Sequence, residues 1–273
     1  MKILNHRLHH DDGSPYPFKR SPNQSRAITP EYLIMHFTAG ASAGSSINWL
    51  TNPQAKASAH LVIGRDGAIT QLVAFNRKAW HAGRSRLGTR KGFNNFSIGI
   101  ELANAGALKH SGGGWKTSWG GAIDDDKVVE AAHKNGGPVR GWEDYPEAQL
   151  NAALEVGALL ARHYKLKDVL GHEDIAPGRK TDPGPAFPLE SFRGAVVGRE
   201  EEDDDAHVTT TALNIRTGPG TGNDKLPVSP LPEGTRLEVL AESGVWRQVD
   251  VLDRIGGDND IHGWVHGRFI RPA

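Results

Sequence analysis

The sequence Tyr32-Leu-Ile-Met-His-Phe37 is an apolar run that carries one histidine near its end and stops at Thr38-Ala-Gly40. A short apolar run bounded by turn residues is typical of a buried strand. Further along, His60-Leu-Val-Ile63 and Ala68-Ile-Thr-Gln-Leu-Val-Ala74 flank Gly64-Arg-Asp-Gly67, which predicts a hairpin. The chain around the histidine therefore belongs to a region rich in strands.

A second stretch, Ser97-Ile-Gly-Ile-Glu-Leu102, alternates strictly between apolar residues and small or polar ones. Because successive side chains of a strand point to opposite faces, the two isoleucines and Leu102 share one face. Gly99 and Glu101 lie on the other. The pattern predicts a strand with one apolar side and a single carboxylate on its polar side.

Helical signals alternate with these strands. Residues Ser45 to Leu50 predict a short helix closed by Asn52-Pro53. Pro146 opens a longer helix, in which apolar residues recur with the i, i+3, i+4, i+7 spacing of a single stripe. That stripe comprises Leu150, Ala153, Leu154, Gly157, Leu160, Ala161 and Tyr164. The mixture predicts an α/β fold with a mixed central β-sheet flanked by helices.

Residues 104–143 are rich in glycine and tryptophan, with Gly112-Gly-Gly-Trp115 and Ser118-Trp-Gly-Gly121 as examples. A segment of this length is too long for a plain connection between two elements. We therefore interpret it as an insertion that borders a functional site.

The run Arg199-Glu-Glu-Glu-Asp-Asp-Asp-Ala-His207 holds consecutive acids, which repel one another and resist folding. From about Val208, short alternating strands are punctuated by glycine and proline, which predicts a small all-β barrel. We therefore divide the chain into residues 1–195, an acidic linker over residues 196–207, and a second domain over residues 208–273.

Composition narrows the chemistry. Hydrophobic residues make up 37% of the chain and charged residues 23%, which suits a packed globular core. The chain has 0 cysteines, so disulfides, thiolate metal sites and a cysteine nucleophile are excluded. Residues 1–198 carry 24 Lys and Arg against 18 Asp and Glu, a mild excess that suits an anionic polymer or ordinary surface variation. No dense basic stripe favours nucleic acid as a partner.

No apolar run approaches the roughly 18–20 residues that cross a bilayer, so we expect no membrane span. The first residues, Met1-Lys-Ile-Leu-Asn-His-Arg7, lack the apolar core of a secretory signal. We expect synthesis in the cytoplasm without a visible signal peptide. A target outside the cell would then be reached by another export route or after lysis.

The segment Gly171-His-Glu-Asp-Ile-Ala-Pro-Gly-Arg-Lys-Thr-Asp-Pro-Gly184 is too rich in charge, proline and glycine for a core element. Loops of this kind carry functional sites. His172 and Asp182 can fold onto one metal ion, with His36 as a third ligand, and two histidines and one carboxylate leave a catalytic position open on zinc. An isolated histidine on an apolar strand is more often a hydrogen-bonded core residue, and spacing alone leaves both interpretations open.

Four segments in order resemble the zinc-dependent N-acetylmuramoyl-L-alanine amidase family, which includes phage T7 lysozyme and animal peptidoglycan-recognition proteins. The segments are Leu33-Ile-Met-His-Phe-Thr-Ala-Gly40, Ser58-Ala-His-Leu-Val-Ile-Gly-Arg-Asp-Gly67, Ala79-Trp-His-Ala-Gly83 with Ser97-Ile-Gly-Ile-Glu-Leu102, and Gly171-His-Glu-Asp-Ile-Ala-Pro-Gly-Arg-Lys-Thr-Asp-Pro-Gly184. The resemblance covers residues 30 to 190 or so. Several matches in order are specific, whereas each short motif alone is not.

The resemblance implies one catalytic Zn²⁺ bound by His36, His172 and Asp182. It also implies Glu101 as the base that activates water, and Lys180 as the residue that stabilises the reacting carbonyl. A salt-bridged Glu101 and a solvated loop lysine are the simpler alternatives for these two residues.

One family feature is missing from this sequence. Several members place a tyrosine directly before the histidine of the second motif, where this chain has Ala59. Any role of that hydroxyl is absent here or filled by another residue.

Four more side chains are candidates for substrate binding. His60 and His81 either line a groove or serve as structural histidines, and the structural interpretation is slightly favoured. Trp80 and Trp115 either stack on sugar or peptide or act as packing residues. The sequence does not decide between these alternatives.

The C-terminal part resembles a bacterial SH3-like domain through Leu213-Asn-Ile-Arg-Thr-Gly-Pro-Gly220, Leu231-Pro-Glu-Gly-Thr235 and Gly263-Trp-Val-His266. That resemblance implies binding to cell-wall peptides. By default we place Trp246, Trp264 and Phe269 in the core of the barrel.

The resemblance as a whole implies a peptidoglycan hydrolase that cleaves the amide bond between N-acetylmuramic acid and L-alanine of the stem peptide. The alternative is a non-catalytic peptidoglycan-binding receptor on the same fold, which is expected to lack a complete metal triad. A zinc peptidase has no supporting His-Glu-x-x-His motif. An endolysin, an exported effector and a wall-recycling enzyme all remain open, as do the stem-peptide preference and the oligomeric state.

Overall fold

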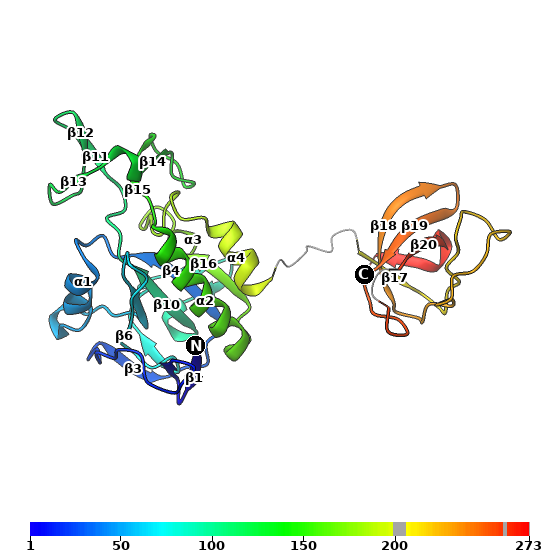
Figure 1. Cartoon of the computed structure of the whole chain (residues 1–273), viewed down its shortest axis with the longest axis horizontal. Coiled ribbons are helices and arrows are strands. Elements are labelled where there is room, and N and C mark those ends of the chain that lie inside the picture. Colours follow the sequence, from blue (N-terminus) through cyan, green and yellow to red (C-terminus); the bar gives the residue numbers. More distant parts are fainter. Residues whose placement is uncertain (199–205, 259–260, 273) are drawn as a thin grey trace. The chain divides into compact units, whose positions relative to one another are not determined.

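The computed structural model describes residues 1–198, 206–258 and 261–272. The chain forms two compact units, Met1–Arg199 and Glu200–Ala273 (Figure 1). Most of the predicted acidic linker, residues 199–205, lies outside the described residues. Its flanks are ordered elements, since residues 196–197 end a helix and residues 206–207 begin a strand.

The first unit is built on a five-stranded sheet with the order β16-β4-β10-β5-β6. The strands are β16 (Asp168–Gly171), β4 (Tyr32–Phe37), β10 (Ser97–Leu102), β5 (Leu61–Ile63) and β6 (Ile69–Gln71). The first four are parallel, and β6 pairs antiparallel with β5. The sheet is therefore mixed, as the sequence predicts, and β4 and β10 have the predicted bounds.

Four helices accompany the sheet (Figure 1). They are α1 (Ala43–Leu50), α2 (Glu147–Tyr164), α3 (His172–Ile175) and α4 (Leu189–Val197). Pro146 precedes α2, as predicted, but the buried face of α2 is rotated from the predicted stripe. Gln149 and Val156 are fully buried, whereas Leu150 and Leu154 are only partly buried. Within the described part of the chain, no helix has both the length and the hydropathy needed to cross a membrane.

The two faces of the sheet differ in chemistry. Ile98, Ile100 and Leu102 of β10 join the main core with α2 and α4, as the alternation predicts. The opposite face of β4 carries Ile34, in a smaller apolar cluster, and then His36. Alternation along two adjacent strands therefore directs one set of apolar residues to the helices and places His36 and Glu101 on the second face, beyond Ile34.

Short sheets surround this core. They are β1 (Lys2–Leu4) with β2 (Arg7–His9), β3 (Gln24–Ala27) with β7 (Arg77–Ala79), and β8 (Arg86–Leu87) with β9 (Arg90–Lys91). The predicted insertion forms a three-stranded sheet of β11 (Lys109–Ser111), β12 (Gly114–Lys116) and β13 (Ala122–Ile123), followed by the pair β14 (Val128–Ala131) and β15 (Arg140–Glu143). Strands β11 to β13 extend away from the central sheet (Figure 1).

The second unit is an antiparallel five-stranded sheet with the order β20-β19-β18-β17-β21. Its strands are β17 (Ala206–Thr209), β18 (Arg236–Ser243), β19 (Trp246–Val251), β20 (His262–His266) and β21 (Ile270–Pro272). The core is aliphatic and does not include the three aromatics assigned to it by default. Phe269 is 39% exposed, and Trp246 and Trp264 are partly exposed, so that assignment was wrong.

Candidate metal and catalytic site

Two strands and one loop bring the predicted ligands together. His36 lies near the end of β4, and His172 follows β16, the strand that pairs with β4 on the side away from β10. Asp182 comes ten residues later in the same loop, where its carbonyl oxygen accepts a hydrogen bond of 2.9 Å from the backbone N–H of Glu173. Adjacent parallel strands therefore deliver the two histidines to one edge, and the loop folds back with the carboxylate.

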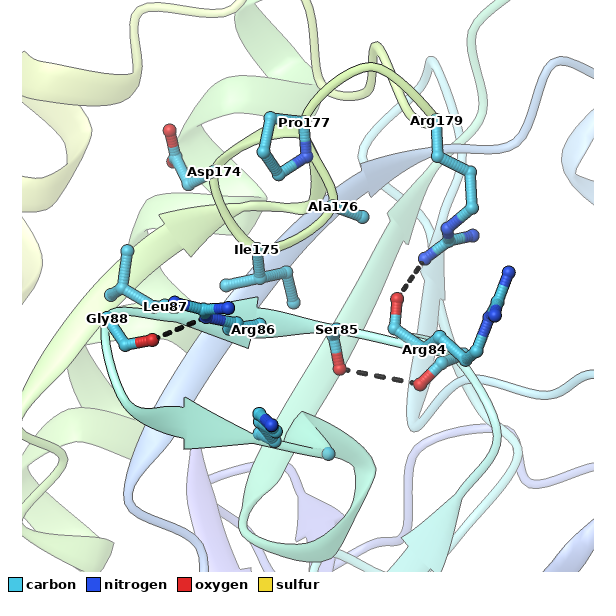
Figure 2. A pocket seen from close by; sticks show the side chains of 13 residues that line it. Arg84, Ser85, Arg86, Leu87, Gly88, Asp174, Ile175, Ala176, Pro177 and Arg179 are labelled. Atoms are coloured by element: carbon cyan, nitrogen blue, oxygen red, sulfur yellow. Dashed lines mark hydrogen bonds between the residues drawn. The ribbon is translucent and has the colours of Figure 1, made fainter.

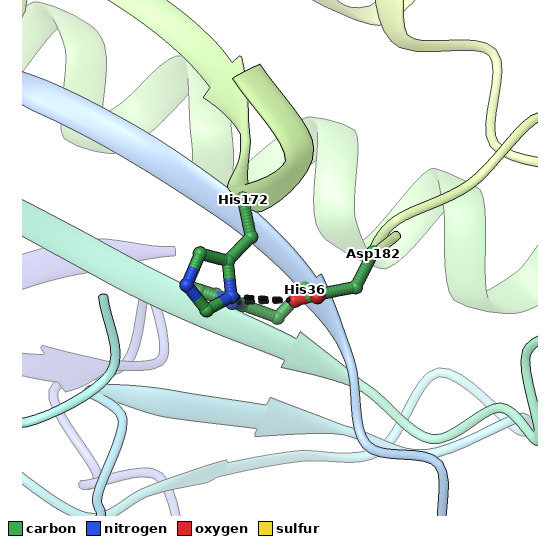
Figure 3. A group of neighbouring side chains, drawn as sticks. All are labelled: His36, His172 and Asp182. Atoms are coloured by element: carbon green, nitrogen blue, oxygen red, sulfur yellow. Dashed lines mark hydrogen bonds and ion pairs between the residues drawn. The ribbon is translucent and has the colours of Figure 1, made fainter. Parts of the chain in front are cut away.

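The three donor atoms face one another (Figure 3). The Nδ1 atoms of His36 and His172 are 3.0 Å apart, and each is 2.9 Å from Oδ2 of Asp182. A tetrahedral zinc with bonds near 2.0–2.1 Å separates its ligand atoms by roughly 3.3 Å, so an opening of a few tenths of an ångström admits the ion. All three residues are buried, and the donor set of two nitrogens and one oxygen fits zinc.

Electrostatics favour the forms that bind a metal. Burial lowers the pKa of His36 to about 4, and the nearby His172 adds to that effect, so His36 is neutral at pH 7. Burial alone would raise the pKa of Asp182, but its close contacts with His172 and His36 outweigh burial and hold that pKa well below its ordinary value. A neutral imidazole and an ionised carboxylate are the states that coordinate zinc.

Glu101 is the direct neighbour of His36 in the parallel register of β10 and β4. Its side chain is on the same face as the cluster and is partly exposed, but its Oε2 is buried and has no hydrogen-bond partner among the described residues. Burial raises the pKa of Glu101 well above its ordinary value, Asp182 raises it further, and Lys180 opposes the shift. A carboxyl with a raised pKa can both accept and return a proton near neutral pH.

A hollow of about 280 Å³ borders Glu101, between residues 38–40 and α1. Its lining includes Thr38, Ser45, Ser46 and Trp49, and Trp49 is 58% exposed. A second hollow, of about 910 Å³, is lined by residues 83–88, 91–92, 174–177 and 179 (Figure 2). The loop that carries His172 and Asp182 therefore borders the larger hollow, and Glu101 borders the smaller one.

The four residues predicted to bind substrate do not line these two hollows. His60 is fully buried; its Nε2 donates to the carbonyl of Arg77, and its Nδ1 accepts the N–H of Gly99. His81 is also buried and contacts His36. Trp80 donates to Ser25 at 3.4 Å, and Trp115 packs on the backbone of Gly141. None of the four lines either hollow described above, and both histidines fit the structural alternative.

Sequence reasoning missed a buried contact between the insertion and the metal-binding loop. Oε2 of Glu173 lies 2.6 Å from Nε2 of His133 and accepts the N–H of Gly184 at 3.2 Å. Lys134 lies 3.1 Å from Oε1 of the same carboxylate. The insertion therefore holds the loop between His172 and Asp182. The one feature of the sequence that could have indicated this contact is that Glu173 directly follows the predicted ligand His172.

Ala59, at the position of the missing family tyrosine, is fully buried in an apolar cluster beneath α1. It contributes packing there and offers no polar group to the site.

Together, the sheet and the cluster define an α/β protein with a buried His–His–Asp set that fits one metal ion beside a carboxyl of raised pKa. Residues 25–185, more than half of the chain, match the N-acetylmuramoyl-L-alanine amidase family. The chain therefore belongs to the N-acetylmuramoyl-L-alanine amidase family.

Two relatives from Escherichia coli (strain K12) are similar to this chain. One is 1,6-anhydro-N-acetylmuramyl-L-alanine amidase AmpD, 34% identical over 191 residues that span 63% of this chain and 85% of AmpD. The other is N-acetylmuramoyl-L-alanine amidase AmiD, 29% identical over 242 residues that span 85% of this chain and 73% of AmiD. The AmpD of Citrobacter freundii matches over 58% of its length.

Among solved structures, the crystal structure of a selenomethionine derivative of AmpD has a TM-score of 0.50 and 26% sequence identity. It covers 72% of this chain and 99% of that chain. The predicted α/β architecture of the first unit is thus confirmed. The SH3-like barrel of the second unit stays a prediction.

Proposed function

We propose that this chain hydrolyses the amide bond between N-acetylmuramic acid and the L-alanine of the stem peptide in peptidoglycan, with one zinc ion held by His36, His172 and Asp182. Membership of the amidase family supports the choice of bond. The observation that carries the site is the convergence of three buried donor atoms within 3.0 Å, beside a glutamate in register with one of them.

A zinc ion held there supplies a Lewis acid that polarises the amide carbonyl and acidifies water. Glu101 takes the proton of the attacking water as the oxygen bonds to the carbonyl carbon. The same carboxyl then passes the proton to the nitrogen as the C–N bond breaks. Lys180, close enough to influence the pKa of Glu101, stabilises the negative charge that develops on the carbonyl oxygen.

The products are a carboxylate on the muramic acid lactyl group and a free α-amine on L-alanine. The chain retains all five residues that this reaction needs, which favours an enzyme over a non-catalytic receptor. We assign the action to the cell wall. For the second unit, we propose an SH3-like wall-binding module, on the strength of its sequence resemblance and its antiparallel sheet.

The test uses a soluble muropeptide and counts new α-amines. Treatment with a chelator is expected to stop turnover, and added Zn²⁺ to restore it. Glu101→Gln is expected to bind one zinc as the unmodified chain does and to lose turnover. His36→Ala is expected to lose both. Unmodified turnover by the Glu101→Gln variant would refute the catalytic assignment.

A further inference from the structure

Two consecutive residues, His81 and Ala82, contact the far sides of both candidate zinc histidines. Nδ1 of His81 lies 3.0 Å from Nε2 of His36. The carbonyl oxygen of Ala82 lies 3.2 Å from Nε2 of His172. In each case the contacted nitrogen is the one that points away from Asp182. We call His81 and Ala82 the strap.

The Ala82 contact fixes the tautomer of His172. A carbonyl oxygen only accepts hydrogen bonds, so Nε2 of His172 carries the proton. In the neutral ring, Nδ1 then presents a lone pair to the cluster. The strap therefore determines which nitrogen of His172 is available to a metal.

A longer chain of bonds fixes the tautomer of His36. Ser97 donates its hydroxyl proton to the carbonyl of Phe93 at 2.6 Å, so its oxygen offers only lone pairs to Nε2 of His81, 3.2 Å away. Nε2 of His81 therefore carries the proton, and Nδ1 of His81 accepts. The donor to that acceptor is Nε2 of His36, which leaves Nδ1 of His36 as a lone pair.

The opposite tautomer of His81 would place two lone pairs against each other at Ser97. In the zinc-loaded chain, these tautomers leave three atoms that carry lone pairs and no proton within 3.0 Å of one another, on His36, His172 and Asp182. That arrangement is satisfied by a bound cation.

The strap is itself held in place. Oδ1 of Asn94 accepts the backbone N–H of His81 at 3.1 Å and that of Ala82 at 2.7 Å. The ring of His81 lies directly on Gly99, where a Cβ atom would approach it to 2.5 Å. Arg179 donates a further bond of 3.1 Å to the Ala82 carbonyl. The absence of a side chain at Gly99 is therefore what gives His81 its place.

We propose that His81 and Ala82 are positioning residues that set the tautomer and orientation of both zinc-binding histidines, His81 through its ring and Ala82 through its carbonyl. The inference rests on the zinc site of the proposed function. Outer hydrogen-bond partners of metal-binding histidines typically contribute about 10- to 100-fold in metal affinity.

The test compares His81→Asn with His81→Leu, two side chains of similar shape. The Asn oxygen takes the place of Nδ1 and still accepts from His36, whereas Leu cannot accept. Zinc affinity is measured by competition with a chromophoric chelator. We expect His81→Leu to lose about 10- to 100-fold and His81→Asn to stay close to the unmodified chain. Equal affinities for the two variants would overturn the proposal.

His60 provides the control, because it is also buried and forms no hydrogen bond with either zinc histidine, although its ring packs edge-on against that of His81. His60→Asn and His60→Leu are expected to bind zinc with the same affinity as each other. A difference between them as large as that at His81 would contradict a specific role of the strap.

A second measurement needs no variant and so does not depend on the folding of His81→Leu. Nitrogen-15 NMR of the histidine rings is expected to show the proton on Nε2 of His36, His81 and His172 in the zinc-loaded chain. A proton on Nδ1 of His81 would overturn the proposal. An unmodified chain that binds no zinc would overturn the proposed function and this inference together, whereas equal His81 variants would overturn this inference alone.

Discussion

Glu101 shows what a single residue's neighbours add to a sequence pattern. Strict alternation along residues 97–102 predicts that Glu101 lies opposite the apolar face, and it does. The pattern does not predict that Oε2 is buried without a partner, because that depends on α1 and on the loop around Lys180, which are distant in sequence. The same burial raises the pKa that the proposed reaction uses.

The burial of Glu101 predicts that Glu101→Gln, which is expected to lose turnover, is more stable than the unmodified chain at high pH. A folded-state pKa above the unfolded value of 4.5 means that the folded chain retains a proton that the unfolded chain releases. Stability therefore falls as pH rises from about 4.5 toward the folded-state pKa. Glu101→Gln removes this effect, so its stability advantage over the unmodified chain should grow with pH.

Urea unfolding at pH 5 and pH 8, with a chelator present, measures this difference. The burial-lowered pKa values of the histidines affect both proteins alike, so the comparison isolates Glu101. A stability difference between the two proteins that is the same at both pH values would contradict a buried, titrating Glu101.

At the scale of elements, strand and helix positions were largely predictable. β4 and β10 follow from apolar runs and alternation, and α2 from Pro146 and its periodic stripe. The exact buried face of α2 was not predictable from the sequence. Gln149 is fully buried there because its side chain forms hydrogen bonds at the ends of β5 and β10. Its amide donates to the carbonyls of Ile63 and Ala103. The periodic spacing of apolar residues does not predict such hydrogen bonds from a polar side chain.

Gln149 predicts a measurable loss. In Gln149→Leu, the buried carbonyls of Ile63 and Ala103 both lose the side-chain donor, but the Ile63 carbonyl still accepts the backbone N–H of Ala103. A buried carbonyl left without a donor, as at Ala103, costs about 1–3 kcal/mol. The loss of Gln149 Oε1, which has no partner among the described residues, offsets part of that cost. Asn151→Leu, on the exposed side of the same helix, is the matched control and is expected to change stability little. Urea unfolding of both variants tests this, and equal stabilities would contradict the role of the buried amide.

Contacts between elements explain the rest of the candidate site. The three ligands were predictable because a family pattern names them one by one, and the structure brings them together. His81 was expected as a groove or structural residue, and Asn94 and Glu173 were not predicted. Their importance arises only when residues 80–97, 133 and 171–184 fold against one another.

At the scale of the whole molecule, the two units have separate hydrophobic cores. The first contains every residue of the proposed reaction. The second contains exposed aromatic surface, with Phe269 and His266 in ring contact beside Trp246. We propose that the first unit carries the chemistry and that the second attaches to the wall.

Removal of residues 206–273 is therefore expected to leave cleavage of a soluble muropeptide unchanged and to reduce cosedimentation with insoluble cell walls. The full chain, measured on both substrates, is the control. An equal loss on the soluble muropeptide would show that the second unit supports the reaction itself.

The most direct test of the proposed reaction is digestion of purified peptidoglycan, with and without a chelator, followed by mass spectrometry of the products. We predict stem peptides with a new L-alanine amino terminus, formed only when the chelator is absent. Glycan fragments with new reducing ends, formed whether or not the chelator is present, would contradict a metal-dependent amidase.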